Sequence, residues 1–387
     1  MEEPTQPADL AGPISSTVRR WRRLTVRHGL QWSELLLIAL NLYGLRGNNT
    51  EGMRLRGSSE GEEFMTVLPS DRATSPFSLR AHVDPSSPQH GLSELCVDGT
   101  PVAEIIEAEP GDEVRGYLRA DGTAATLVLQ SGTDAQELVK NYRDLLQALG
   151  SDLSDDGTPH VFQEVMLTAI HEHDEALVVE NLIAVREAMT AEGLPESTTL
   201  GVLTPALHSE AAFEELAEKV GPILLFLTTE SFEERRADPT VEGSATQEAA
   251  AADPGTPEAA GADPVAAEAQ QSERLAGILA AARAAGHRTS FTYTVGSEPL
   301  DEMRAWLLPI AEQTTMWPSL TILPAKTPVD DSQHVAAPDE RLDFFLEARS
   351  LLEQIFAPTK LRPEPWRCYR GLWYREHAGE PLAGPYV

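Results

Sequence analysis

Short apolar runs and longer amphipathic stretches alternate between residues 124 and 328. Six of the short runs are almost continuously apolar, as expected of parallel strands that are covered on both faces. Stretches with helical spacing of apolar residues lie between them. Because parallel strands need crossover helices, this order predicts a parallel sheet of six βα units, which right-handed crossovers would curl into a partial (β/α)6 barrel. The predicted strands cover residues 125–130, 162–168, 198–204, 222–228, 289–295 and 318–324.

Residues 52–123 show a different pattern, because short and partly alternating apolar segments are divided there by Gly, Pro, Ser and Asp. This pattern is typical of antiparallel strands joined by short turns. Residues 1–51 combine a polar tail with two helical segments, and the apolar run Glu34 to Leu45 in the second is too short to span a bilayer. We therefore predict an α/β protein in which a parallel partial barrel follows an N-terminal helical part and a small antiparallel β region.

Two further segments interrupt or follow the barrel pattern. Residues 237–271 hold seven acids and neither basic nor aromatic side chains, so they cannot bury enough apolar surface to offset the loss of chain entropy. We expect them to form a disordered insertion between the fourth strand and its helix. Residues 329–387 contain a predicted helix over 339–356 and a tail rich in aromatic and Arg residues, which we expect to seal one end of the barrel.

The chain is strongly acidic, with a formal net charge of −31. Such a field repels polyanions, so we predict no binding to nucleic acid or to acidic membranes. The basic stretch VRRWRRLTVRH, residues 18–28, could dock an acidic partner or RNA, but we expect it to pair with the chain's own acidic surface. The acidic start of the chain does not fit a signal peptide, and the presence of only two cysteines favours a reduced, cytoplasmic protein.

Polar side chains follow the predicted strands at their carboxyl ends, where parallel sheets bind ligands. In the densest group, IHEHD (170–174), His171 and His173 could bind one metal ion, since imidazole is a common ligand of Zn, Fe or Ni. A general acid or base role for either histidine is equally open, because imidazole titrates near neutral pH. The carboxylate that a metal site would also need could come from Asp134, Glu230 or Glu298.

Both polar groups at the strand ends also have a structural interpretation. In the first, Glu172 and Asp174 would complement the dipole of the next helix. The second group is YTVGSEP (293–299). In its functional interpretation, Gly296 would let a ligand approach the backbone closely, and Glu298 could accept a hydrogen bond from a ribose or an amine. A tight turn with an acidic helix start explains the same residues, so both interpretations stay open.

The order of the six βα units resembles the radical S-adenosylmethionine (radical SAM) superfamily, whose core is a partial, TIM-like (β/α)6 barrel. TYTVGSEPLDEM (292–303) is similar to the fifth-strand segment that lies behind the adenine and methionine of SAM in that superfamily, and PSLTILPAKTP (318–328) is similar to its sixth strand. LDFFLEARSLLEQIF (342–356) looks like the end of some members. The residues that the resemblance places beside a SAM-like ligand are Glu230, Gly296 and Glu298.

The resemblance fails at the motif that carries the chemistry of the superfamily. Its first loop holds CxxxCxxC, which binds a [4Fe–4S] cluster, whereas the corresponding segment here reads QSGTDAQELVKNY. Because the chain has only Cys96 and Cys368, it cannot supply three thiolates to a cluster. The Gly-Gly-Glu-like turn after the second strand, which holds the amino group of SAM, is replaced by AIHEHD.

These observations favour a cluster-less radical-SAM-like protein that acts as a non-catalytic partner or binding subunit in a biosynthetic pathway, with a protein or a small molecule as its partner. One alternative is a non-radical enzyme, a lyase or hydrolase that uses metal-assisted or acid/base chemistry at the barrel mouth. Its catalytic residues would be His171, His173 and Asp134, with Glu230 and Glu298 as further rim groups. Another is a protein that binds SAM without an iron–sulfur cluster. SAM and a divalent metal are thus the candidate cofactors, and the sequence leaves open whether the protein is an enzyme.

Overall fold

The computed structural model describes most of the chain, and its residues fall into two compact units. The N-terminal unit contains the described residues up to Glu109, and the barrel unit contains those from Tyr117 onward. No helix among them is both long and apolar enough to cross a membrane. The described ranges are 14–47, 53–68, 75–81, 93–109, 117–118, 124–130, 134–151, 162–229, 264–296, 298–323, 338–363 and 372–382.

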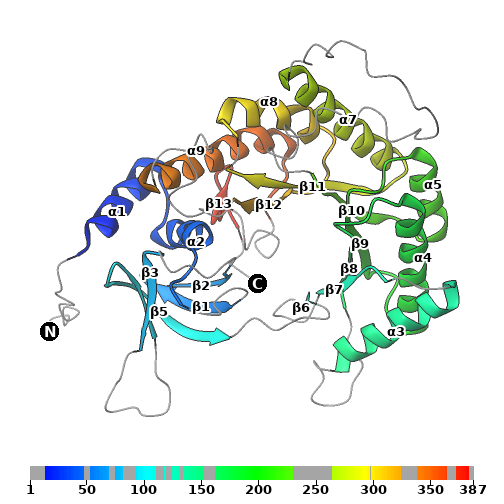
Figure 1. Cartoon of the computed structure of the whole chain (residues 1–387), viewed down its shortest axis with the longest axis horizontal. Helices are drawn as coiled ribbons and strands as arrows, with labels where there is room; N and C mark the ends of the chain where they lie inside the picture. The colour runs from blue at the N-terminus through cyan, green and yellow to red at the C-terminus, as the bar shows by residue number, and fades with distance from the viewer. Residues whose placement is uncertain are drawn as a thin grey trace, which may run out of the picture. The chain divides into compact units, whose positions relative to one another are not determined.

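The N-terminal unit consists of two helices and an antiparallel sheet, as predicted, with strand order β2-β1-β5-β4-β3 (Figure 1). Trp21 stacks on Tyr43 at 5.9 Å between ring centroids and also contacts Phe77, so α1 is held by its aromatic side chain. The second helix is buried along almost its whole length, and Cys96 is 1% exposed in the core. The elements are α1 (Ser16–His28), α2 (Trp32–Tyr43), β1 (Arg54–Ser59), β2 (Glu62–Val67), β3 (Phe77–Ala81), β4 (Ser93–Val97) and β5 (Thr100–Glu109).

The barrel unit is built on a curled sheet in which six parallel strands follow one another in sequence order (Figure 1). This half barrel confirms the predicted fold class. Its strands are β7 (Ala124–Val128), β8 (Glu164–Thr168), β9 (Thr199–Thr204), β10 (Ile223–Leu227), β11 (Arg288–Val295) and β12 (Ser319–Ile322). Helices cover its convex face, namely α3 (Ala135–Ser151), α4 (Glu175–Ala191), α5 (Glu210–Lys219), α7 (Pro264–Ala284) and α8 (Leu300–Ala311), and α9 (Pro338–Phe356) packs beside α8.

Two elements differ from the sequence-based prediction. The short strand β6 (Tyr117–Leu118) pairs antiparallel with β7, so it extends the barrel sheet and does not belong to the small β region. The disordered insertion was predicted to extend to residue 271, and this end is wrong. Helix α7 begins at Pro264, so residues 264–271 are helical. The reason is that proline suits the first turn of a helix, and the Ala, Glu and Gln residues that follow favour helix. Residues 237–263 lie outside the described ranges.

Aromatic packing joins the C-terminal tail to the last strands. Trp317, just before β12, contacts Phe356 at 5.1 Å, Tyr374 at 5.6 Å and His377 at 4.8 Å between ring centroids. The Nε of Arg349 donates to the carbonyl of Trp373 at 2.7 Å, and its guanidinium lies 4.3 Å from the centroid of the Tyr374 ring. A small hairpin, β13 (Glu376–His377) and β14 (Glu380–Pro381), follows. The described part of the tail thus packs its aromatic side chains against Trp317 and Arg349. The sealing of one end of the barrel by the tail stays a prediction.

Candidate functional site

The carboxyl ends of β7 to β12 form one rim, where parallel sheets bind ligands. Three acidic side chains of this rim accept hydrogen bonds from backbone N–H groups of their own loops or helix starts. Asp134 accepts from the N–H of Glu137 at 2.9 Å, at the start of α3. Glu172 accepts from the N–H groups of His173 and Asp174, and Asp174 caps α4 by accepting from Ala176 and Leu177. These contacts support the structural interpretation of the three carboxylates.

The predicted histidines lie on one exposed turn between β8 and α4. His171 and His173 are both exposed, so solvent or a ligand can reach their rings. Within the described residues, no three His, Cys, Asp or Glu side chains are grouped so that they could hold a metal ion. Glu230, one candidate for the third ligand, lies outside the described residues. The metal site therefore stays a prediction.

The other predicted ligand-binding residues lie at the end of β11. Gly296 has a φ of 120°, and a Cβ at this position would lie 2.7 Å from Cζ of Phe345 in α9. Glycine is therefore needed there both for its backbone conformation and for the close packing of the Phe345 ring. Glu298 is buried, with 4% of its surface exposed, and Pro299 is the N-cap of α8. The binding of a ligand by Gly296 or Glu298 stays a prediction.

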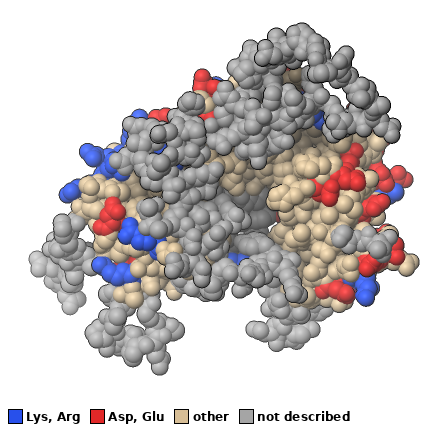
Figure 2. Space-filling view, in the orientation of Figure 1, with Lys and Arg blue, Asp and Glu red and all other residues tan. Residues whose placement is uncertain are grey.

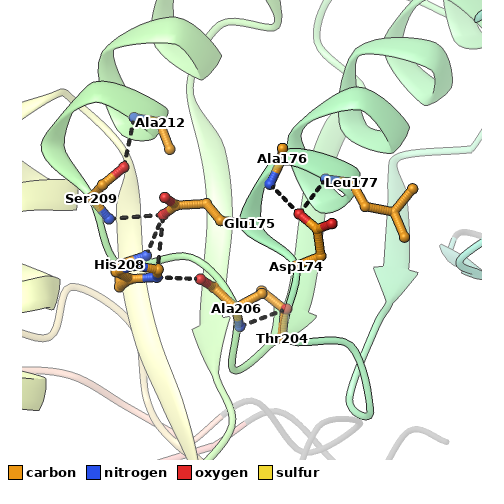
Figure 3. A network of polar contacts seen from close by, with 9 residues as sticks. All are labelled: Asp174, Glu175, Ala176, Leu177, Thr204, Ala206, His208, Ser209 and Ala212. Carbon is orange, nitrogen blue, oxygen red and sulfur yellow. Dashed lines mark hydrogen bonds and ion pairs between the residues drawn. The ribbon is translucent and has the colours of Figure 1, made fainter. Parts of the chain in front are cut away.

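A histidine to which the sequence assigned no role is held at the neighbouring strand end. Glu175, the first residue of α4, accepts hydrogen bonds from the N–H groups of His208 and Ser209 at 2.7 and 2.8 Å (Figure 3). Nδ1 of His208 lies 2.6 Å from the carbonyl oxygen of Ala206 and 3.5 Å from Oε1 of Glu175. Both neighbours are acceptors, so Nδ1 carries the proton. This leaves Nε2 of a ring that is 52% exposed to face solvent or a ligand.

The Glu175 carboxylate is electrostatically stabilised by this arrangement. Burial would raise the pKa of Glu175, but the N–H groups of His208 and Ser209, the Ser209 hydroxyl and the His208 ring outweigh burial and lower that pKa below its usual value. Glu175 therefore stays ionised and links α4 to the loop before α5. No local pattern in the sequence indicates this link, because the two partners lie 33 residues apart.

A second, buried network fixes the end of β7. The hydroxyl of Tyr142 in α3 donates to Oδ1 of Asn181 in α4, and the N–H of Gln130 donates to the same hydroxyl at 3.0 Å. Both Tyr142 and Asn181 are fully buried. Burial, opposed by the contact with the Gln130 N–H, raises the pKa of Tyr142 to about 12, so its hydroxyl stays protonated at neutral pH. The network holds the carboxyl end of β7 at Gln130.

The concave face of the sheet can be derived from the strand register. Phe291 and Tyr293 contact Trp306 of α8, so they project toward the helices, and the residues alternating with them project to the opposite, inner face. Directly paired residues on neighbouring strands share a face. The inner face therefore carries Thr126, Val128, Met166, Thr168, Gly201, Leu203, Leu224, Phe226, Ser290, Thr292, Thr294, Ser319 and Thr321.

This inner face combines apolar and hydroxyl side chains. Its apolar part is a cluster of Met166, Leu224 and Phe226 with Met316, against which Leu203 packs. Its hydroxyl part consists of half-buried Thr side chains and Ser319, together with the fully buried Ser290, and the hydroxyls of Thr294 and Thr321 lie 3.0 Å apart. On the described strands, ionisable side chains reach this face only at the amino ends, as Glu164 and Arg288. The face is thus chemically suited to an uncharged ligand with polar and apolar parts.

The rim and the inner face differ in the chemistry that they offer. The rim presents the exposed imidazole rings of His171, His173 and His208. The inner face presents hydroxyl groups, which can donate and accept hydrogen bonds. No protein-family model matches the chain, and a search of curated proteins finds no matching sequence.

Proposed function

We propose that the chain is a radical-SAM-like half barrel without an iron–sulfur cluster, and that it serves as a non-catalytic binding or partner subunit in a biosynthetic pathway. The observation that carries the proposal is the combination of six sequential parallel βα units with a first loop that has no thiolate. Of the two cysteines in the chain, Cys96 is buried in the N-terminal unit. A cluster with three thiolates therefore cannot form from this chain.

The contacts at the rim support a binding role over a catalytic one. Catalytic carboxylates are aimed at the reacting groups of a substrate, whereas Asp134, Glu172, Asp174 and Glu175 accept hydrogen bonds from the backbone of their own loops and helices. The inner face adds hydroxyl groups beside an apolar cluster, which suits the recognition of a neutral molecule. Such a subunit would hold or present a ligand on which a partner enzyme acts.

The test is to purify the affinity-tagged full chain from the cells that produce it and to measure the mass of the purified particle. We expect a complex of fixed stoichiometry with a second protein. A parallel sample, treated with iron, sulfide and reductant, should acquire no stoichiometric iron–sulfur cluster. A strictly monomeric chain that turns over a substrate by itself would overturn the proposal.

One observation favours a second function, a non-radical enzyme with acid/base chemistry. Nδ1 of His208 is fixed by the carbonyl of Ala206, which leaves Nε2 open at the rim in the manner of a general base. In that case, the variant His208→Gln would abolish turnover of a substrate without changing its binding. Metal analysis of the tag-free protein tests the metal-assisted version, because functional metal sites are normally filled stoichiometrically.

A further inference from the structure

The helix α1 presents an arginine-rich surface on an otherwise acidic protein. It contains five arginines and a histidine in 13 residues, and no acid. Val18, Trp21 and Thr25 are buried, so the apolar side of the helix is already used in the core of the N-terminal unit. The opposite side is exposed, and Figure 2 shows basic side chains gathered over this helix. The exposed arginines on α1 are Arg19, Arg22, Arg23 and Arg27.

The arginines of α1 differ in their contacts. Arg22 forms an ion pair with Glu60, and its guanidinium lies 3.8 Å from the centroid of the Trp32 ring. The expectation that this stretch pairs with the chain's own acids is therefore confirmed for Arg22. In the part of the chain that the structure describes, the side chains of Arg19 and Arg23 form no ion pair or hydrogen bond. These two arginines lie four residues apart and thus project side by side from the helix.

One exposed apolar side chain accompanies these two arginines. Val26 is 84% exposed and lies three residues after Arg23, on the same side of the helix. Together, Arg19, Arg23 and Val26 form what we call the α1 patch. Ile14 is also exposed, but it precedes the helix at the end opposite to Val26 and is not part of the patch. Apolar side chains beside unpaired charges are typical of surfaces that bind other proteins, since burial of the apolar atoms adds to the electrostatic attraction.

The composition of the α1 patch distinguishes between classes of partner. Membrane-binding helices insert their apolar side into the lipid, but the apolar side of α1 is buried in the protein. Single-stranded nucleic acid is bound by basic grooves with exposed aromatic rings on which bases stack. Here the nearby Trp21 and Trp32 are 2% and 4% exposed, and the net charge of −31 repels polyanions.

We propose that the α1 patch docks a partner protein whose surface places two carboxylates about 6 Å apart, one turn of a helix, beside an apolar side chain. Arg19 and Arg23 would bind the carboxylates, and Val26 would pack against the apolar side chain. The inference rests on the proposed function because it assigns the partner's binding site to the N-terminal unit. It does not depend on any ligand of the half barrel.

The test compares three forms of the full chain that have the same fold: the wild type, Arg19→Glu/Arg23→Glu and Arg274→Glu/Arg304→Glu. Arg274 and Arg304 are exposed on α7 and α8 and, within the described residues, likewise have no ion pair. Both double variants change the net charge equally, so only the position of the change differs. The probe is a fluorescein-labelled helical peptide with Glu at positions i and i+4 and Leu at i+3 and i+7. Circular dichroism and thermal melting establish that each variant is folded.

We expect the wild type and Arg274→Glu/Arg304→Glu to bind the peptide equally, and Arg19→Glu/Arg23→Glu to bind it at least about tenfold more weakly, as two lost ion pairs require. Binding should weaken with added salt. Equal binding by all three proteins, no binding at millimolar concentration, or tighter binding of an RNA oligonucleotide or of anionic vesicles would overturn the inference.

Co-purification from the producing cells separates this inference from the proposed function. A partner that is lost only from Arg19→Glu/Arg23→Glu supports both. A partner that all three proteins retain overturns docking at the α1 patch but leaves the proposed function intact. If the wild type recovers no partner, both the proposed function and the docking of a cellular partner at the α1 patch are overturned. This holds even if the peptide binds.

Discussion

The two halves of the barrel sheet are built in different ways. In β7 to β9, the buried residues of the strands are mostly aliphatic, β7 packs against α3, which follows it directly in sequence, and α3 packs in turn against α4. In β10 to β12, rings from distant segments form one connected series. The series runs through Tyr293, Trp306, Phe291, Phe356, Trp317, Tyr374 and His377.

The difference shows which part of the half barrel is specified locally. A strand and the helix after it can form the first half from nearby sequence alone. The second half needs α9 and residues 372–382, which are far from β11 in the chain, so it can be completed only after long-range closure. Four changes test this comparison.

The largest effect should come from Trp317→Ala. Trp317 is 3% exposed and contacts three other rings, so its truncation should lower the free energy of unfolding by about 3–5 kcal/mol. Urea unfolding followed by circular dichroism measures this loss. The control is Leu308→Ala in α8, where the side chain is 45% exposed and the cost should be below about 0.5 kcal/mol. Equal costs for the two variants would refute the structural role of the ring series.

Gly296→Ala should cost about 2–4 kcal/mol, because it adds a clash with Phe345 to the strain of a φ of 120°. The matched variant Gly193→Ala, after α4, keeps the strain without the clash, since its φ is 72° and a Cβ there would meet no atom within 4 Å. It should cost about 1–2 kcal/mol. Thermal or urea unfolding gives both values, and combining Gly296→Ala with Phe345→Leu should recover part of the difference. An equal cost at both glycines would contradict the close packing of α9.

Two buried tyrosines offer a matched pair between the halves. Tyr142→Phe in the first half removes a hydroxyl that is bonded to Asn181 and Gln130, and should cost about 1–2 kcal/mol. Tyr293→Phe in the second half removes a hydroxyl that has no hydrogen-bond partner among the described residues, so it should be neutral or slightly stabilising. Urea unfolding curves of the two variants give the change in the free energy of unfolding for each. A larger loss for Tyr293→Phe would reverse the assignment of the polar network to the first half.

Acidification should produce the smallest effect and should act on the second half. Burial lowers the pKa of His287, opposed by its contact with the Phe213 carbonyl. Burial is also the main cause of the lowered pKa of His377. The unfolded chain therefore binds protons at the usual histidine pKa of about 6.5, whereas the folded chain binds them only at lower pH. Stability is thus complete above about pH 6.5 and is lost as the pH falls below that value toward the folded pKa values.

The pH effect can be measured as the urea midpoint at a series of pH values. His287→Gln should reduce the slope relative to the wild type, because it removes a buried histidine whose pKa is lowered in the folded chain. A slope that is the same in the variant and in the wild type would show that other groups cause the pH dependence. The acid sensitivity of the barrel unit would then have a cause other than His287.

The sequence was sufficient for the elements that depend on local pattern. All six parallel strands were predicted within about two residues, because buried parallel strands read as continuous apolar runs. The start of α7 was missed, since residues 264–271 continue the low-complexity composition of the segment before them, although most of them are good helix formers. The antiparallel edge strand β6 was misplaced because pairing partners cannot be derived from a two-residue strand.

The candidate site was predicted only in part, for a related reason. Strand-end positions follow from topology, so His171, His173 and Asp134 were correctly placed on the rim. The contacts that decide their chemistry are not periodic. The link from Glu175 to His208 and the packing of Phe345 on Gly296 join residues 33 and 49 positions apart (345 − 296), beyond the range of any helical or strand repeat. The same limit applies to the ring series of the second half.

The most direct test of the proposed role is an omission assay with the partner enzyme that co-purifies with this chain. Turnover is measured for the partner alone, for this chain alone and for the two together. We predict that this chain alone has no activity and that the partner is active only when the chain is present. Turnover by this chain alone, or equal activity of the partner without it, would contradict the account.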